Sequence, residues 1–472
     1  MRKPIAIALL SLLASGCMIG PDYVRPQVET PTAWRLSEQD ARDLANTAWW
    51  EQFGDPVLND LVSTALHANK DLMIATARVE EFAGNYGIVR AALFPQVGAG
   101  YEARRQRDVS AAVLGAGAGD TFNSYQAVLN ASWEIDIWGR IRRQSEAARA
   151  QLLASEEGRQ GVILSLVGSV ASAYINLRDL DRQLEIARST ARSRGESYEI
   201  FKLRFAGGII SLLELSQNQS QYEEALATIP PLEKAIAQQE NGLSVLLGRN
   251  PAPIARGKNI DQLTLPAIPA GLPSDLLERR PDIRRAEQNL IAANALIGAA
   301  KAAYFPTISL TGFFGYASTS MSKLFDSQSK VWQYAAPISM PIFTAGAIAG
   351  QVQAAEATQQ QALFSYQKAI QEAFREVNDS LVSQERTHEQ LKAQKRQVEA
   401  LQTYAATARL RYENGYTSYI EVLDAERSLF NAQLQYTQTQ QAQFQAMINL
   451  YLAMGGGWVS EAEKMASANP SQ

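Results

Sequence analysis

A short motif that turns one long helix back into another occurs twice, and it limits the chain to a duplicated helical-hairpin design. The copies are Arg204-Phe-Ala-Gly-Gly-Ile-Ile-Ser-Leu-Leu-Glu214 and Arg411-Tyr-Glu-Asn-Gly-Tyr-Thr-Ser-Tyr-Ile-Glu421. A glycine in each suits the left-handed residue that ends a helix. A serine then suits the N-cap of the next helix, and a glutamate three residues on completes a capping box. These residues are Gly208, Ser211 and Glu214 in the first copy, and Gly415, Ser418 and Glu421 in the second. Their constant spacing predicts an internal twofold sequence repeat.

Charge and histidine content argue against two broad classes of function. The 472 residues hold 44 Lys and Arg against 48 Asp and Glu, so the chain is slightly acidic and has no basic patch for nucleic acid. The two histidines, His67 and His388, are far apart, and each lies alone on a helical pattern. The sequence also lacks a nucleotide-binding loop and a nucleophile–base pair. We therefore expect neither an enzyme nor a metal or cofactor site.

The first residues are typical of a targeting sequence. A positively charged start precedes the apolar run Ile5 to Leu13, and the only cysteine, Cys17, follows small residues. This resembles a bacterial lipoprotein signal over residues 1–16, with Cys17 carrying S-diacylglycerol and N-palmitoyl lipid. Ala14 departs from the usual leucine, and an ordinary signal peptide with an incidental cysteine is the alternative. By the same resemblance, Met18 in place of aspartate favours sorting to the outer membrane.

Proline and glycine content and hydrophobic period divide the rest of the chain. We expect an extended, lipidated segment over 17–55, a first structural repeat over 56–248, a linker over 249–273, a second repeat over 274–457 and a flexible tail over 458–472. Each repeat contains a β-hairpin, at about 96–137 and 307–343, and a long helical hairpin that turns near 207–210 or 414–417.

Strict alternation marks the β-hairpins. From Tyr125 to Ile135, apolar and aromatic residues alternate with mostly polar ones. Such a strand faces lipid on one side and water on the other, or else belongs to a soluble hairpin with one buried face. Pro337 and Pro341 are awkward inside a central strand. After the targeting sequence, no run reaches the ~18 consecutive apolar residues of a spanning helix, so only strands would cross a membrane.

The helical patterns are unusually long. No proline interrupts Gly139 to Phe205, which is roughly 100 Å of helix and implies coiled-coil-like packing. The returning helix, Ser211 to Leu247, contains Pro230 and Pro231, which predict a kink. Helices of about 35 Å and 55 Å stacked end to end match one long helix, so each repeat could supply two staves of a helical tube.

Four strands cannot close a barrel, and open edges in lipid leave backbone groups unpaired. Two copies would give eight strands around a filled interior, and three copies would give twelve around a pore.

Several motifs together resemble one family. They are Pro21-Asp-Tyr-Val-Arg-Pro26 after Cys17, Trp133-Glu-Ile-Asp-Ile-Trp-Gly-Arg140, Leu272-Pro-Ser-Asp-Leu-Leu-Glu-Arg-Arg-Pro-Asp282, Ala303-Tyr-Phe-Pro306, Pro341-Ile-Phe-Thr-Ala-Gly346 and Leu423-Asp-Ala-Glu-Arg-Ser-Leu429. Over the whole mature chain, they resemble the outer membrane factors, in particular the lipoprotein branch that serves drug-efflux pumps of the resistance-nodulation-division (RND) class. The resemblance implies a mixed α and β membrane protein. It would be a homotrimer with a twelve-stranded outer-membrane β-barrel, four strands per chain, continuing into a twelve-helix periplasmic α-barrel.

The function implied is the passive exit channel of a tripartite multidrug efflux pump. The partners implied are a periplasmic adaptor protein, an inner-membrane RND-type transporter and outer-membrane lipid. An exit duct for type I protein secretion is an alternative within the same class. A non-channel, envelope-spanning coiled-coil lipoprotein is an alternative from a different class, but it leaves the amphipathic strands unexplained.

The resemblance also implies a gate at the periplasmic tip, where Glu421 and Asp424 form acidic rings. Ile420, Asp424 and Arg427 share one helix stripe. Glu421 can instead be only the cap of Ser418, and Asp424 can be a gate residue or an ion-pair partner of Arg427. Gln217 stands at the position that matches Asp424 in the first repeat, so we expect one strong acidic ring of three.

Two further assignments follow from the resemblance. Tyr412 and Glu214 match a latch between the two turns, but Thr417 stands where that latch usually has an arginine. The adaptor would dock at the turns, around Gly208, Ser211, Gly415 and Ser418.

Overall fold

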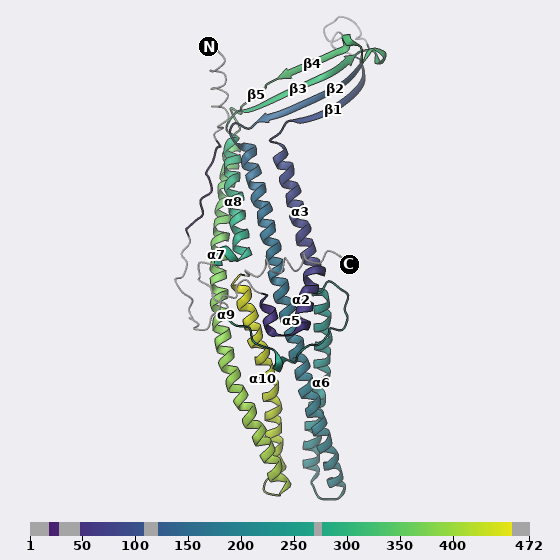
Figure 1. Cartoon of the computed structure of the whole chain (residues 1–472), viewed down its shortest axis with the longest axis vertical. Helices are drawn as coiled ribbons and strands as arrows, with labels where there is room; N and C mark the ends of the chain where they lie inside the picture. Colours follow the sequence, from purple (N-terminus) through teal and green to yellow (C-terminus); the bar gives the residue numbers. More distant parts are fainter. Residues whose placement is uncertain (1–17, 28–47, 108–120, 269–275, 456–472) are drawn as a thin grey trace. The chain divides into compact units, whose positions relative to one another are not determined.

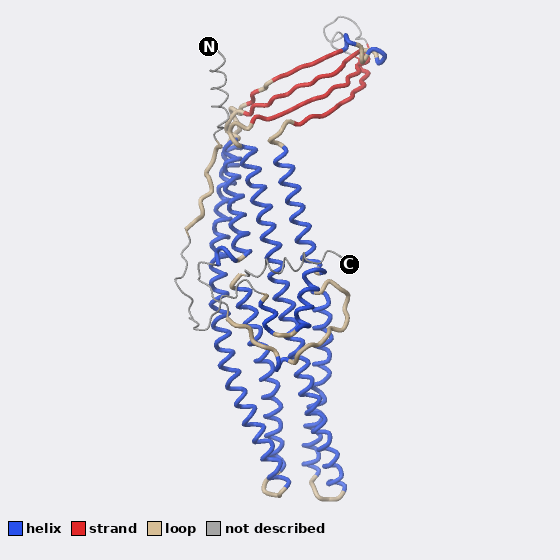
Figure 2. Tube along the Cα trace, in the orientation of Figure 1, coloured by secondary structure: helices blue, strands red, loops and turns tan. Residues whose placement is uncertain are grey.

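The computed structural model describes residues 18–27, 48–107, 121–268 and 276–455, and most of them are helical (Figures 1 and 2). Corresponding elements of the two repeats have equal lengths. α3 (Lys70–Ala91) and α8 (Pro281–Ala302) have 22 residues, β1 (Gln96–Arg107) and β3 (Thr307–Ser318) have 12, α5 (Arg140–Ala206) and α9 (Ala347–Glu413) have 67, and α6 (Leu212–Leu246) and α10 (Tyr419–Ala453) have 35. These pairs follow the twofold repeat predicted from the sequence.

The chain forms two compact units that cut across the repeats. Unit 1 comprises Met1–Gln27, Arg78–Glu156 and Arg285–Gln367, and unit 2 comprises Val28–Ala77, Glu157–Arg284 and Lys368–Gln472. Each unit therefore contains one part of both repeats.

The shorter elements are η1 (Trp49–Phe53), α2 (Pro56–Ala68), η2 (Ile260–Gln262), α7 (Leu276–Arg279), η4 (Met321–Lys323) and η5 (Ser327–Ser329).

Unit 1 contains an antiparallel sheet in the order β1-β2-β3-β4 (Figure 1). β2 is Thr121–Ile135 and β4 is Lys330–Ala335. The two-residue β5, Ile338–Ser339, also pairs with β3 and follows β4 along the same edge. Pro337 lies between β4 and β5, where a residue without an N–H breaks the ladder, as its place in the sequence suggests.

The register of the sheet gathers apolar side chains on one face. Leu129 pairs with Ala99 on one side and with Phe314 on the other, and Phe314 pairs with Trp332. Directly paired residues share a face, so these four side chains form one row across the sheet. Leu129, Phe314 and Trp332 are 54%, 48% and 65% exposed, so this apolar face has no cover within the described chain.

The segment after Cys17 is tied to unit 1 by polar contacts. The backbone N–H of Ile19 donates to the Trp138 carbonyl (3.1 Å), and the buried Arg143 donates to Asp22 (2.7 Å). Further along, Tyr23 and Arg25 both donate to the Glu287 carboxylate. The Pro21–Pro26 motif is therefore a strap that holds the chain against α5 and α8.

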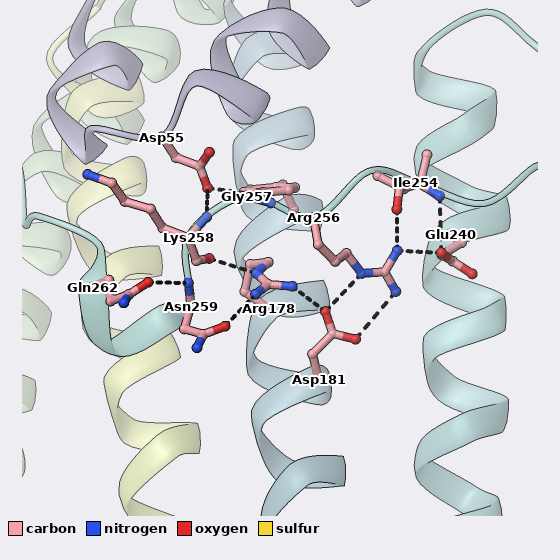
Figure 3. A network of polar contacts seen from close by, with 11 residues as sticks. Asp55, Arg178, Asp181, Glu240, Ile254, Arg256, Gly257, Lys258, Asn259 and Gln262 are labelled. Atoms are coloured by element: carbon pink, nitrogen blue, oxygen red, sulfur yellow. Dashed lines mark hydrogen bonds and ion pairs between the residues drawn. The ribbon is translucent and has the colours of Figure 1, made fainter.

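In unit 2, a polar network centred on the buried Asp55 joins four segments (Figure 3). The Asp55 carboxylate caps α2 by accepting from Val57 N–H (3.0 Å), and it also accepts from the Tyr174 hydroxyl (2.7 Å) and Lys258 N–H (2.9 Å). Arg178 of α5 donates to the Lys258 carbonyl at 2.8 Å. The network fixes residues 254–259, within the predicted linker, against α2 and α5.

The ion pairs of Asp181 extend this network toward α6. Its carboxylate accepts from Arg178 Nη1 (2.6 Å) and Arg256 Nε (2.9 Å). Arg256 Nη1 also lies 2.5 Å from Glu240 of α6. The linker therefore connects the two helices of the first hairpin.

Pro230 and Pro231 lie inside α6, which continues through both of them, and the kink expected at these residues stays a prediction. Only the two backbone N–H groups of these prolines are missing, and the rest of a 35-residue helix is retained. In addition, an 18-residue window of α5 is long and apolar enough to cross a membrane by length and composition alone, although half of it is buried within the chain.

We predict that Asp55→Ala destabilises the protein by about 3 kcal/mol, because it removes the acceptor of two part-buried backbone N–H groups and of one buried hydroxyl. Thermal unfolding of the purified protein in detergent would measure the loss. Asp60→Ala is the matched control, since Asp60 lies exposed on the same helix. Equal melting temperatures for the two variants would contradict a stabilising role for the network.

Candidate functional site at the helical reversals

Both helical hairpins reverse through the same backbone motif (Figure 1). Gly208 and Gly415 have φ values of 69° and 77°, in the left-handed region. Gly208 N–H donates to the Phe205 carbonyl and Ile209 N–H to the Arg204 carbonyl, both at 2.9 Å. Gly415 and Tyr416 repeat these two bonds in the second hairpin. This is the Schellman arrangement, which satisfies the last carbonyls of α5 and α9.

The first reversal forms the capping box predicted from the sequence. Glu214 N–H donates to Ser211 Oγ at 3.2 Å, and Ser211 N–H donates to Glu214 Oε2 at 2.9 Å. Glu214 is therefore engaged with its own helix terminus. Among the described residues, none of its hydrogen bonds reaches Tyr412, so the structure does not join the two candidate latch residues.

The capping box predicted at the second reversal is wrong. Ser418 has the same backbone angles as Ser211, but its side chain makes no capping hydrogen bond. The Glu421 carboxylate instead accepts from Arg411 at 3.0 Å and from the Thr417 hydroxyl. The bond to Arg411 adds the attraction of opposite charges, which a carboxylate bond to a neutral backbone N–H lacks. Because Ile210 stands at the position of Thr417, the first reversal lacks this second donor.

Three of the four candidate gate residues form one exposed stripe on α10. Ile420 is 62% exposed, and Arg427 Nη2 lies 3.1 Å from Asp424 Oδ1. Both side chains of this ion pair are more than half exposed, so the pair contributes little stability. Asp424 thus keeps a carboxylate that water and ions can reach. Glu421 lies apart from the stripe, paired with the end of α9.

A cluster of aromatic and apolar side chains joins the two hairpins behind the reversals. The buried rings of Phe201 and Tyr419 lie 4.4 Å apart, and Tyr412 packs against both at 6.3 Å and 5.1 Å. Val422 and Ala425 of α10 are fully buried in the same cluster. The structure therefore gives Tyr412 a packing role between α5 and α10.

Tyr419 provides a polar link that sequence reasoning missed. Its hydroxyl accepts a hydrogen bond from Asn218 of α6, and both residues are buried. Burial, and next the charge of Glu426, raises the pKa of Tyr419 to about 12, so the hydroxyl stays protonated at neutral pH. In the sequence, Tyr419 looks like an ordinary aromatic residue at a helix start, and only the packing of two distant hairpins brings Asn218 to it.

The remaining candidate residues fall into two groups. The four residues assigned to adaptor docking, Gly208, Ser211, Gly415 and Ser418, are all exposed. Large apolar side chains beside them are also exposed, including Ile209 (75%), Leu213 (66%) and Tyr416 (78%). Cys17 lies outside the described residues. Within the described part of the chain, no group of three or more His, Cys, Asp or Glu side chains is placed to hold a metal ion.

Comparison with known proteins assigns the family. The model of the family described as Outer membrane efflux protein matches residues 61–249 and 272–456. The chain belongs to the outer membrane efflux protein family. Its two matched segments correspond to the two repeats, and the protein is located in the outer membrane, as the sequence predicted.

Several named proteins are similar in sequence or structure to this outer membrane efflux protein over nearly its whole length. The probable efflux pump outer membrane protein TtgC of Pseudomonas putida is 36% identical, over 98% of this chain and 96% of its own. The cation efflux system protein CusC of Escherichia coli is 38% identical, over 95% and 97%. The open-state crystal structure of the MtrE outer membrane channel of Neisseria gonorrhoeae has a TM-score of 0.85 at 32% identity, over 94% of this chain and 99% of that one.

We predict that Tyr419→Phe loosens the reversals without unfolding the protein, because the ring stays in its cluster while buried Asn218 loses its partner. Backbone amides at residues 201–219 and 408–430 should exchange with deuterium about tenfold faster. Tyr416→Phe removes the same hydroxyl from an exposed side chain of the same turn and serves as control. Unchanged protection in Tyr419→Phe would show that the link contributes nothing to local stability.

Proposed function

We propose that the protein is the exit channel of a tripartite drug-efflux pump, assembled as a homotrimer. The observation that supports the trimer most strongly is the sheet, whose strands β1 and β4 each have one free edge while its apolar face is exposed. In lipid, each unpaired backbone group costs several kcal/mol, so neighbouring copies must pair these edges. The strands β1, β2 and β3 have 12, 15 and 12 residues, enough to cross a bilayer when tilted.

The number of copies follows from the need for an open pore in the proposed barrel. β4 and β5 occupy one strand position, so each chain supplies four positions. Two chains would close an eight-stranded barrel filled by side chains, whereas three give twelve strands and room for a pore. In the proposed trimer, the helices of the three chains form a twelve-helix periplasmic tunnel. A coiled-coil lipoprotein without a channel would have no use for an amphipathic sheet.

Relatives support efflux over protein secretion as the task of the pump. Proteins named for antibiotic efflux and for toluene efflux in Pseudomonas putida are each 36% identical to this chain. The relative named for cation efflux is comparably similar, at 38%. In this proposal, the channel conducts passively, and an RND-type transporter in the inner membrane selects the substrate and supplies the energy.

The reversals are the proposed gate and docking surface. Around a threefold axis, Asp424 would form one acidic ring and Ile420 one apolar ring, because both lie on the exposed stripe of α10. The exposed apolar side chains at the two turns would receive the periplasmic adaptor. Adaptor binding must favour the open aperture over the closed one, since only a difference in affinity shifts the equilibrium.

Single-channel conductance in planar bilayers tests the gate. We expect a small, cation-selective conductance from the wild type and a clearly larger, less selective one from Asp424→Ala, because the mutation removes the acidic ring. Millimolar Mg²⁺ should reduce the wild-type conductance and leave the mutant unaffected. Gln217→Ala, at the matching position of the first repeat, is the control. If folded trimers of wild type and Asp424→Ala conduct equally, closure depends on other contacts, and Tyr412→Phe is then the variant to measure.

The proposed lipid on Cys17 is tested separately. The contacts of Ile19 and of the Pro21–Pro26 strap hold the chain that follows Cys17 against unit 1. Unit 1 also contains the sheet, so a lipid on Cys17 would suit an anchor in the membrane that the sheet is proposed to cross. Mass spectrometry of the mature N-terminal peptide should find Cys17 as the first residue, with diacylglycerol on sulfur and an acyl chain on nitrogen. Cys17→Ser should lack both, and an unmodified Cys17 in the wild type would refute lipidation.

A further inference from the structure

The apolar face of the sheet carries positive charge at its outer end, which is the end of the strands that does not join the helices. Lys330 of β4 is two residues from Trp332, and Arg105 of β1 is six residues from Ala99. Side chains an even number of residues apart share a face, so both cations lie on the face of the apolar row. The Lys330 ammonium lies 5.0 Å from the centre of the Phe314 ring. Cations therefore border the apolar surface directly.

The connection between β3 and β4 adds a third cation, Lys323, at the same end. The Tyr101 hydroxyl donates to Met321 Sδ at 3.5 Å, and the Phe325 ring lies 5.5 Å from the ring of Tyr316. Both tyrosines belong to the apolar face, in the row next to the apolar one. The connection therefore packs against this face, with Lys323 between its two contacts.

Internal contacts hold the connection in place. Leu324 is fully buried. The carbonyl of Lys323 accepts from Ser329 Oγ at 2.7 Å and from Asp326 N–H at 3.2 Å. The backbone of Lys323 is therefore fixed, while the residue itself is exposed.

The three cations have no carboxylate partner in the described part of the chain. We call them the cationic rim: Arg105, Lys323 and Lys330. All three are exposed, and none forms an ion pair with a described residue. Asp326 is the one carboxylate in the connection between β3 and β4, and it forms no ion pair there. Asp108 and Asp120, between β1 and β2, lie outside the described residues.

The opposite face of the sheet has its charges in pairs. The described strands contain two carboxylates, Glu102 and Glu134, and the register places both on this opposite face. Glu102 pairs with Arg104 at 2.5 Å, and Glu134 pairs with Arg140 at 2.7 Å. An excess of positive charge is therefore particular to the apolar face.

The two ends of the apolar face also differ from each other. At the end that joins the helices, its last row consists of Ile135, Ile308 and Ile338, which carry no charge. Aromatic residues are typical of both interfaces of a membrane barrel, whereas here the cations occur at one end. A leaflet with more anionic headgroups on that side accounts for the difference, because basic residues are attracted to such a surface.

The spread of the cationic rim indicates how many phosphates its ligand carries. Arg105 and Lys330 stand on strands three spacings apart, roughly 14 Å, and four rows apart along the strands, roughly 13 Å. A single phosphate does not span that separation. Guanidinium and ammonium groups both bind phosphate, so the rim fits several phosphates side by side.

We propose that the cationic rim binds a membrane lipid whose headgroup carries more than one phosphate. The phosphates accept hydrogen bonds from the rim, and the acyl chains lie along the exposed side chains of Leu129, Phe314 and Trp332. The placement of this lipid in the outer leaflet rests on the proposed function, because it requires the sheet to cross the membrane. Binding by the rim itself does not.

Native mass spectrometry of the purified full-length protein in neutral detergent tests the rim, with diphosphorylated lipid A as the titrated ligand. We expect saturable binding, with monophosphorylated lipid A and phosphatidylglycerol bound more weakly and inorganic phosphate unable to compete. The rim variant combines Arg105→Gln, Lys323→Gln and Lys330→Gln. It should bind lipid A about tenfold or more weakly, because each cation near an anionic lipid surface strengthens binding severalfold.

A matched triple variant removes the same charge elsewhere. It combines Arg104→Gln, Lys234→Gln and Lys392→Gln. Arg104 is next to Arg105 but lies on the opposite face, and the two lysines are exposed on α6 and α9. This control should bind lipid A as the wild type does. Unchanged melting temperatures in both triple variants separate loss of binding from loss of folding.

Several outcomes would contradict the proposal. No saturable binding to the wild type, or equal binding to the wild type and the rim variant, would overturn it. An equal loss in the control would show that overall charge, rather than the rim, holds the lipid. Equal affinity for phosphatidylglycerol, or displacement by inorganic phosphate, would overturn the requirement for a lipid with several phosphates. Channel conductance is measured independently, so its failure would remove only the placement in the outer leaflet, and failure of lipid binding would leave the proposed channel untouched.

Discussion

The backbone of a sheet in lipid must find all its hydrogen-bond partners in protein, and this requirement limits how such a chain can assemble. Its sheet has one apolar face, two free edges and too few strands to close. In water, such edges would be solvated, but in a bilayer they demand copies of the same sheet. In the proposed trimer, oligomerisation would be a condition for insertion, and the long helices attached to each hairpin would follow the same symmetry.

Duplication explains why corresponding elements of the two repeats have equal lengths. Differences in sequence between the repeats give each reversal its own side-chain contacts. The two reversals share their backbone angles and their Schellman bonds. A few side chains then make them different. Thr417 in place of Ile210 helps to draw Glu421 away from its cap toward Arg411, and Asp424 in place of Gln217 puts a carboxylate on the exposed stripe. The asymmetry of the tip therefore depends on a few substitutions within an otherwise equal framework.

The sequence predicts those features that depend on local chemistry. Proline, glycine and N-cap residues mark the ends of the helices, and strict alternation marks β1, β2 and β3, because backbone preferences act over a few residues. The prediction is wrong where partners compete. Arg411 and Thr417 together bind Glu421, and Ser418 is left without its predicted partner.

Contacts between distant helices escape sequence reasoning altogether. The link from Asn218 to Tyr419 and the network around Asp55 each join segments that lie far apart in the chain. None of these residues is unusual for its local pattern. Their importance comes from burial, which only the packed structure provides.

Buried polar groups without hydrogen-bond partners bear on the gate proposed at the helical reversals, which needs a closed and an open packing. The proposed gate would need two packings that differ by only a few kcal/mol, so the observed packing would have to be only moderately stable. Arg194 Nη2 and Asn218 Oδ1, on the helices that lead to the first reversal, are buried without partners among the described residues. Unmet hydrogen bonds lower the cost of leaving the observed packing.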